Sequence, residues 1–593
     1  MRLPTLWEAG HHTSECLLGR ATPRQAMADR SVFTHIHLQI TVFIVPYGFS
    51  RTVVTDFLAA SRDIRIFRNS NVFFSEQSMT SQDPQSNALR PAGYTDLVDR
   101  FGLEVIPNWH RSLVAQGNTH RVATVDAMVE ETYPASYWPG ESLGDHLEFA
   151  LKYDGTNLGI LARVFAAADP HDIEAYLESK PTGKYVRRIW FLYEFLTGEQ
   201  LSLDDLTRGN YVDLLESKEY YTASKATRIK RQRVNDNLLG SQQFCPTVRR
   251  TDALREFEAA DLPRKCQEAV SSYSPELLKR ARSHLYTKET KSSFEIERIT
   301  PTSNRTERFI SMLQLAENED FCDKPRLMDL QNRIVDPRFK ATDYRDSQNY
   351  VGETVAWQNE RIHYVCPKPE DIHELMDGLI ASHQRLEEGG ASVVVHAASI
   401  AYGFVFMHPF EDGNGRIHRF LIHNILARRE FTPEGIMFPV SAAMLNTPAE
   451  YDASLEAYSR PILELAEYTL EDDGRMTVTN DVAVWYRYVD MTAQTEALYR
   501  FIEQTIDSEL VGELVFLANY DKTKGLLQEI VDMPDRRIDL FIRFCLQNNG
   551  QLSAQKRASH FEFLTDDEVS RMEAAVQTAY GNGTTVDDTT AQL

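Results

Sequence analysis

Twelve consecutive residues, from His408 to Arg419, combine side chains that can hold a phosphorylated ligand and move a proton; their sequence is HPFEDGNGRIHR. Gly413 and Gly415 can adopt positive φ and let main-chain N–H groups face an anion. Asn414, between them, tolerates the same left-handed geometry. Apolar residues then recur at helical spacing, so the turn opens onto a helix N-terminus, where free N–H groups favour phosphate. The sequence therefore predicts an anion-binding loop suited to a triphosphate.

The charged residues of this segment suit the same ligand. Arg416 and Arg419 are three positions apart, so they share one face of the predicted helix, where each guanidinium can bind phosphate oxygens. Asp412 precedes the glycines, and its carboxylate could hold Mg²⁺ against the phosphates. His408 has an ordinary pKa of about 6.5 and can accept a proton near neutral pH. It is the candidate general base.

The elements around this loop are expected to hold it rigidly. Residues 393–407 form a nearly continuous apolar stretch that leads straight into His408, which predicts a helix at the buried centre of its domain. A second helix is predicted after residue 369, because the prolines of CPKPED prevent an earlier start. A buried helix directly before the loop would fix the position of the imidazole.

The segment 408–419 fills every fixed position of the signature HxFx(D/E)GNGRxxR, and on these residues the chain resembles the Fic family. The resemblance implies a mostly α fold: a Fic-type helical domain with a small β-hairpin flap, here flanked by additional helical domains. It also implies a protein adenylyltransferase, which moves AMP from ATP onto a Ser, Thr or Tyr hydroxyl of a target protein. ATP and Mg²⁺ are the expected cofactors.

An upstream segment resembles the inhibitory (S/T)xxxE(G/N) motif of many Fic proteins. Ser293 and Glu297 are four positions apart and so share a helix face. The resemblance implies that Glu297 pairs with Arg419 and blocks seating of the γ-phosphate. A charge pair at ~4 Å in an effective dielectric of ~20 attracts by about 4 kcal/mol before desolvation, enough to bias a switch.

Arg298 stands where the family has Gly or Asn, so we expect it to weaken docking of this helix or to compete with Arg419 for Glu297. An ordinary helix with exposed Ser and Glu is the alternative.

Residues 344–371 resemble the family's flap, a β-hairpin that covers the nucleotide and aligns the target. Val351 has strand preference, and Gly352 marks a bulge or turn; both are expected to contribute to nucleotide binding. An exposed hairpin edge can add a strand from an extended peptide, which suits a target protein that presents a hydroxyl. Tyr451 falls where the family places an aromatic ring near the adenine; stacking there and a place in the core are the two alternatives.

Two other functions stay open. The same chemistry run backwards would remove AMP from a target, with Glu297 orienting a water molecule, as in some family members. A non-catalytic interaction or regulatory protein, acting through its flanking helical domains, is an alternative of a different class. The intact set of His408, Arg416 and Arg419 argues against it.

At 593 residues the chain is too long for one core. The sequence from Met79 reads like a polar protein start, so the residues before it are set apart. We predict a poorly ordered or mis-assigned N-terminal extension (1–78), a helical N-terminal domain (79–250), a Fic catalytic domain that includes the inhibitory helix near 290–300 (251–475), a helical C-terminal domain (476–580) and a disordered tail (581–593).

Composition limits the partners and the compartment. A net charge of −23 disfavours nucleic acids and anionic membranes as general partners, and the apolar run at 38–49 is too short to span a bilayer, which takes ~20 residues. The six cysteines show no CxxC pairing, which indicates a reducing cytoplasm and argues against structural zinc.

His418 and His423 are five positions apart, so we expect packing or surface residues rather than a metal site. A homodimer stays open.

Overall fold

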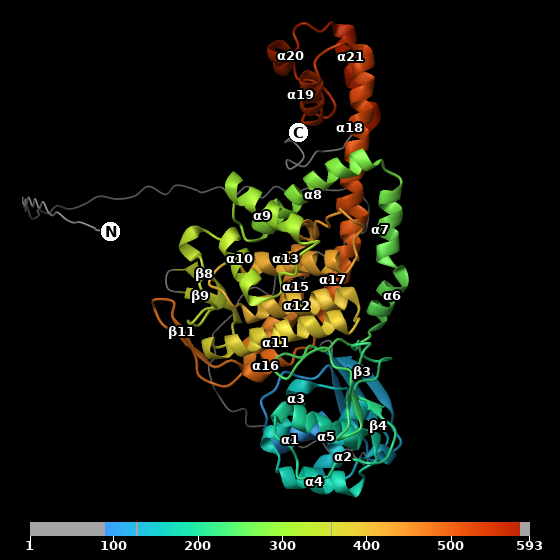
Figure 1. Cartoon of the computed structure of the whole chain (residues 1–593), viewed down its shortest axis with the longest axis vertical. Coiled ribbons are helices and arrows are strands. Elements are labelled where there is room, and N and C mark those ends of the chain that lie inside the picture. Colours follow the sequence, from blue (N-terminus) through green and yellow to red (C-terminus); the bar gives the residue numbers. More distant parts are fainter. Residues whose placement is uncertain (1–88, 126–127, 357–358, 582–593) are drawn as a thin grey trace, which may run out of the picture. The chain divides into compact units, whose positions relative to one another are not determined.

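Most of the described residues lie in helices, as the sequence analysis predicted (Figure 1). The computed structural model describes residues 89–125, 128–356 and 359–581. The predicted N-terminal extension therefore lies outside the described residues, as does the predicted tail apart from its first residue. One cluster of buried apolar side chains includes residues on both sides of the boundaries placed at 250 and 475, so those domain boundaries stay a prediction.

Residues 89–250 combine helices with two small sheets. The first sheet has the strand order β1–β2–β4–β3, with β2 and β4 parallel, and the second has the order β5–β7–β6. The helices were predicted and the sheets were not, because strands of two to six residues are too short to show a clear alternation. The strands are β1 (Arg90–Ala92), β2 (His110–Val114), β3 (Arg121–Val125), β4 (Met128–Tyr133), β5 (Val212–Asp213), β6 (Thr227–Ile229) and β7 (Val234–Asp236), and the helical segments are α1 (Tyr94–Phe101), η1 (Ala135–Tyr137), α2 (Leu143–Phe149), η2 (Ala150–Asp154), α3 (Leu158–Ala167), α4 (Pro170–Ser179) and α5 (Lys184–Thr197).

The predicted catalytic segment is built around α12 (Val393–Met407). Almost every residue of α12 is buried, because α11 (Pro369–Glu388), α13 (Asn414–Arg428) and α17 (Thr492–Gln504) pack against it. The helix ends at His408, whose backbone is left-handed, and Pro409 cannot continue the helix. The other helices of this segment are α6 (Asp252–Ala260), α7 (Leu262–Ser271), α8 (Pro275–Ile296), α9 (Ser303–Leu315), α10 (Lys324–Ile334), η3 (Pro337–Phe339), α14 (Val440–Asn446) and α15 (Pro448–Leu465).

The predicted flap is present as an antiparallel hairpin of β8 (Tyr350–Ala356) and β9 (Asn359–Val365). Its register shifts between Val351 and Gly352, so the predicted irregularity at this glycine is confirmed. A Cβ at Gly352 would lie 2.8 Å from the carbonyl oxygen of Arg361, which explains why the close strand approach needs glycine here. A second hairpin, of β10 (Tyr468–Leu470) and β11 (Met476–Val478), follows later in the chain.

The C-terminal residues form helices, as predicted. Thr565 forms the N-cap of the last helix, since its hydroxyl accepts a hydrogen bond from Glu568 N and the Glu568 side chain accepts one from Thr565 N. Side chains between Tyr520 and Val576 form a second apolar cluster of their own. The helices are α16 (Ala483–Arg487), α18 (Val511–Ile530), α19 (Asp535–Leu546), α20 (Ala554–His560) and α21 (Asp566–Tyr580), with the π-helical turn η4 (Thr505–Leu510) before α18.

In the part of the chain that the structure describes, no helix combines the length and the apolar character needed to cross a membrane. The cysteines found there are buried and unpaired.

Gly378 offers a test of how tightly α11 is packed. A Cβ at this position would lie 2.7 Å from main-chain atoms of both Gln243 and Phe244. Glycine to alanine inside a helix normally stabilises by about 1 kcal/mol, but overpacking of this kind costs about 1–3 kcal/mol. We predict that Gly378→Ala lowers the melting temperature. Gly525→Ala on α18 is the matched control, because no atom lies within 4 Å of its added Cβ; it should raise the melting temperature. Equal stabilisation by both variants would contradict the packing described here.

Candidate active site

His408 stands at the end of α12 with its imidazole held by the helix itself. Its backbone has φ 50°, and its Nδ1 lies 3.1 Å from the carbonyl oxygen of Val405. A carbonyl can only accept, so Nδ1 carries the proton and Nε2 keeps its lone pair. Burial lowers the pKa of His408 to about 4. The imidazole is therefore neutral at physiological pH and can accept a proton through Nε2.

The loop after His408 is closed by Asn414. Its side-chain oxygen accepts a hydrogen bond from Phe410 N at 3.1 Å, and its side-chain nitrogen donates to Phe410 O at 2.7 Å. Phe410 is fully buried and packs near Tyr344, with 5.7 Å between ring centroids. Gly413, with φ 96°, forms the N-cap of α13. Phe410 thus packs inward, and the Asn414 side chain supports the loop.

The carboxylate of Glu297 lies over this helix N-terminus. Its Oε1 is 2.8 Å from Arg419 Nη2, and its Oε2 is 2.7 Å from Arg416 Nε. Arg419 also donates from Nε to Ser293 Oγ at 2.9 Å and from Nη2 to Ser293 O at 2.6 Å. A Cβ on Gly415 would lie 2.6 Å from Glu297 Oε1. The structure brings the predicted partners Glu297 and Arg419 together and adds Arg416, and a side chain at residue 415 would displace the Glu297 carboxylate from its present position.

Asp412 lies at the mouth of the loop. Its Oδ1 accepts a hydrogen bond from Arg416 Nη2 at 2.5 Å, and Arg416 Nη1 donates to Ile334 O at 3.0 Å. About a third of the Asp412 side chain is exposed, at 34%. An accessible hard oxygen donor fits Mg²⁺, which usually takes few protein ligands and completes its shell with water and phosphate oxygens.

Arg298 takes the left-handed position that ends α8. Its φ is 56°, and the hydrogen bonds Arg298 N to Glu295 O (2.8 Å) and Ile299 N to Phe294 O (3.0 Å) form a Schellman motif. Glycine or asparagine is ordinarily preferred in this backbone conformation. The Arg298 side chain is exposed, whereas Glu297 pairs with Arg416 and Arg419. The expectation that Arg298 competes with Arg419 for Glu297 is therefore wrong.

The remaining predicted site residues fall into two groups. Val351 is exposed on β8 and Gly352 follows it, so both lie on the accessible hairpin. Tyr451 is buried, its hydroxyl lies 3.5 Å from Arg419 Nη1, and its ring packs against His418 and Phe501. This packing favours the core alternative for Tyr451 over a place beneath the adenine.

A second contact between α8 and α13 was missed from the sequence. Buried Glu289 lies 2.9 Å from His423 Nε2, and it accepts hydrogen bonds from Ser441 N at 2.9 Å and Ser441 Oγ at 2.5 Å. Glu289, Ser293 and Glu297 recur every four residues, so one face of α8 presents all three. We call their contacts with His423, Arg419 and Arg416 the α8–α13 seam. His418 and His423 were expected to be packing or surface residues, and both pack inside the protein. His418 is fully buried against Tyr402.

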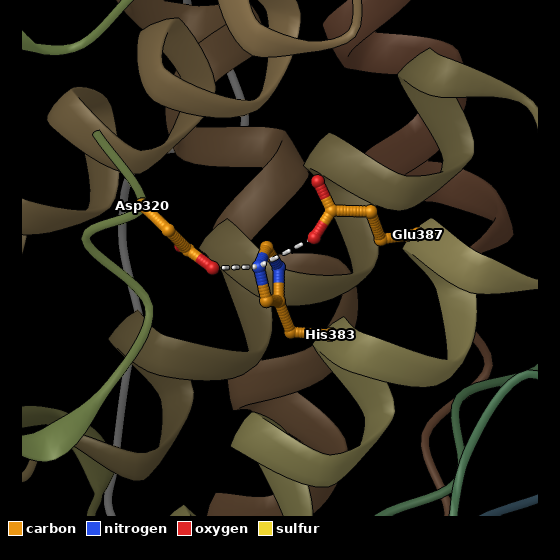
Figure 2. Close-up of side chains that lie close together, drawn as sticks. All are labelled: Asp320, His383 and Glu387. Atoms are coloured by element: carbon orange, nitrogen blue, oxygen red, sulfur yellow. Dashed lines mark hydrogen bonds and ion pairs between the residues drawn. The ribbon is translucent and has the colours of Figure 1, made fainter. Parts of the chain in front are cut away.

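Another polar cluster consists of Asp320, His383 and Glu387, whose ligand atoms lie close enough to meet one cation (Figure 2). His383 Nε2 is 3.1 Å from Asp320 Oδ2 and 3.7 Å from Glu387 Oε2. Arg428 pairs with the outer oxygens of both carboxylates, at 3.5 and 2.7 Å, and so offsets part of their charge.

The protonation of His383 can be read from the residues behind it. Arg429 Nη1 lies 2.9 Å from His396 Nδ1, and an arginine can only donate, so His396 carries its proton on Nε2. That nitrogen is 3.0 Å from His383 Nδ1, which must then accept. His383 therefore keeps its proton on Nε2, directed at Asp320. A metal ion bound to Nε2 of His383 would move the protons of both histidines to their Nδ1 atoms and so break the hydrogen bond from Arg429 to His396. The cluster is therefore better suited to an ion network that joins α11, α13 and the loop before α10.

Comparisons with known proteins give independent information on part of the chain. A sequence model described as "Fic/DOC family" matches residues 321–426. The chain is 30% identical over 122 residues to the "Protein adenylyltransferase Fic" of Aedes aegypti, covering 20% of this chain and 22% of that protein. It is also 30% identical over 153 residues to the "Protein adenylyltransferase fic-1" of Caenorhabditis elegans, covering 25% and 26%.

Among solved structures, a Fic family protein from Desulfovibrio desulfuricans G20 aligns with a TM-score of 0.31 at 16% identity, covering 56% of this chain and 85% of that one. The chain spans about a quarter, or less, of the length of the two curated relatives, at 22% and 26%. The family match includes His408 to Arg419 and the flap but not Ser293, Glu297 or Tyr451. Residues 321–426 of this chain therefore match the Fic/DOC family model.

Proposed function

We propose that this protein is a Fic-type protein adenylyltransferase that transfers AMP from Mg·ATP to a hydroxyl group of a target protein, and that Glu297 holds it in an inhibited state. The observation that carries the proposal is the Glu297 carboxylate, which bridges Arg416 and Arg419 above the glycine loop. A carboxylate in this position stands where phosphate oxygens are expected, at a helix N-terminus that favours anions. The curated relatives, which are named protein adenylyltransferases, support the same chemistry.

In the proposed reaction, Nε2 of His408 takes the proton of the attacking hydroxyl. The hydroxyl oxygen forms a bond to the α-phosphorus, and the bond from that phosphorus to the bridging oxygen of the β-phosphate breaks. The N–H groups around Gly413–Gly415 neutralise charge on the transferred group, and Arg416 and Arg419 hold the departing pyrophosphate. Asp412 would hold Mg²⁺, which neutralises phosphate charge when bound.

The target protein is proposed to dock on the flap. Val351 is exposed on β8, and an extended peptide can pair with a hairpin edge through main-chain hydrogen bonds. Such pairing places a side-chain hydroxyl with little demand on the neighbouring side chains, so a Ser, Thr or Tyr is a suitable acceptor.

The Glu297→Gly variant tests both halves of the proposal. Removing the carboxylate frees both guanidinium groups for ATP, so transfer from α-labelled ATP to protein should rise by roughly 10- to 100-fold, equivalent to about 1.4–2.8 kcal/mol. Adding His408→Ala to this variant should abolish transfer, and Glu411→Gln is a matched control because Glu411 is exposed within the same loop. If Glu297→Gly instead lost an AMP-removing activity and gained no transfer, the protein would be a de-AMPylase.

The low pKa of His408 predicts an unusual pH profile. The base must be neutral, so activity is present above its folded-state pKa and is lost as the pH falls through that value, about 4. The nearby carboxylate of Glu297 raises this pKa, so the Glu297→Gly variant should not titrate at a higher pH. We expect its kcat/KM to stay constant down to about pH 5, with circular dichroism confirming that the protein remains folded. An acid limb centred near 6.5 would contradict the buried, neutral imidazole.

Relief of the left-handed strain at Arg298 should strengthen inhibition. Glycine at this position removes about 1 kcal/mol of strain, so Arg298→Gly should raise the melting temperature and lower basal transfer by up to about fivefold. Arg308→Gly is the matched control, because Arg308 is an exposed arginine inside α9, where glycine should destabilise. Basal transfer that rises in Arg298→Gly would refute this role for the end of α8.

A further inference from the structure

Arg345 is a buried arginine that contacts carbonyl groups of three chain segments: residue 347, residue 367 and residues 408–409. Its Nε donates to His408 O at 2.8 Å, and its own main-chain N donates to Pro409 O at 2.9 Å. Its Nη1 donates to Ser347 O at 2.7 Å, and its Nη2 donates to Pro367 O at 2.6 Å. One side chain with its backbone thus holds four carbonyl groups.

The positive charge of Arg345 is compensated by carbonyl oxygens and not by a carboxylate. The side chain is buried, at 5% exposure, and among the described residues no carboxylate forms an ion pair with it. Burial lowers the pKa of Arg345, yet a guanidinium stays protonated in proteins. An uncompensated buried charge costs several kcal/mol, and an apolar side chain could fill the same space at lower cost. A purely space-filling role is therefore a poor account of this residue.

The four carbonyl groups belong to two parts of the site. His408 and Pro409 lead from the left-handed end of α12 into the loop. Ser347 lies just before β8 and Pro367 just after β9, so their carbonyl groups mark the two ends of the flap. A planar guanidinium donates in fixed directions, so Arg345 sets the position of His408 relative to both ends of the hairpin.

We propose that Arg345 is a positioning residue that aligns the imidazole of His408 with the target hydroxyl presented by the flap. This inference rests on the proposed transferase function. Transfer needs the reacting atoms about 3–3.5 Å apart, and a misplacement of about 1 Å can lower the rate by roughly 10²-fold. The residues that hold the nucleotide, from Asp412 to Arg419, are not hydrogen-bonded to Arg345, so the arginine is expected to affect alignment and not ATP binding.

The experiment compares Arg345→Gln and Arg345→Lys in the Glu297→Gly background. Lysine keeps the charge but not the fork of donors, so both variants should lower kcat for transfer to protein by about 10- to 100-fold. Binding of Mg·ATP, measured by calorimetry, should stay within about twofold of the parent. Transfer of AMP to water, which needs no target on the flap, should fall less than transfer to protein.

A pH profile separates alignment from simple loss of structure. The Arg345 charge lowers the pKa of His408, so the acid limb should move to higher pH in Arg345→Gln and stay in place in Arg345→Lys. Arg338→Gln is the matched control, because Arg338 is an exposed arginine on η3 and its side chain is 80% exposed; it should leave every readout unchanged.

Three results would overturn the inference. Full kcat for protein transfer in both Arg345 variants would show that the arginine does not align the base. A fall in ATP affinity that matches the fall in transfer would show a general structural role. Should Arg345→Gln fail to fold by circular dichroism, Arg345→Lys alone decides between these outcomes. Absence of transfer in the Glu297→Gly parent would overturn the proposed function itself, and this inference with it.

Discussion

Two buried guanidinium groups at the start of α13 need an anion beside them, and much of the surrounding structure serves that requirement. Arg416 and Arg419 are almost inaccessible to solvent, with side-chain exposures of 0% and 2%. Their charges cannot be left to water, so an anion has to be supplied from within the protein or by a ligand. In this structure Glu297 supplies it. The same electrostatic demand would be met by the phosphates of a nucleotide, which is the basis of the proposed inhibition by Glu297.

The rigidity of this site follows from how its backbone is fixed. The buried helix α12 fixes His408 from one side, and the Asn414 side chain closes the loop on the other through two hydrogen bonds to Phe410. Gly415 leaves room for an anion directly above the first turn of α13. Such preorganised main-chain donors do not have to reorient when charge develops, which is the condition under which electrostatic stabilisation is most effective.

The sequence predicted the parts of the site that lie close together along the chain. A twelve-residue segment contains the candidate base, the glycine loop and both arginines, so their relative positions follow from one turn and one helix. Arg345 and the Glu289–His423 contact were missed because, apart from Ser347, the partner residues are 22 to 134 positions away and no local spacing reveals them. The short strands of residues 89–250 were missed because they are too short to show a clear alternation of apolar and polar residues. The Gly or Asn that follows the glutamate in the resembled motif was a usable signal, since it marks the left-handed end that Arg298 occupies.

The α8–α13 seam also constrains how α8 can move. Its contacts, at Glu289, Ser293 and Glu297, are spaced by about one helical turn each, or roughly 5–6 Å along the axis. If α8 slid along its axis by one or two ångströms, Glu289 would separate from His423. Over the same distance, the contacts of Glu297 with Arg416 and Arg419 would lengthen. Several buried polar groups would then lack partners at the same moment, at a cost of about 3–5 kcal/mol for each broken pair. A partial displacement of α8 would therefore cost more than the loss of any one of these contacts, because the three side chains are on one helix face and would move together.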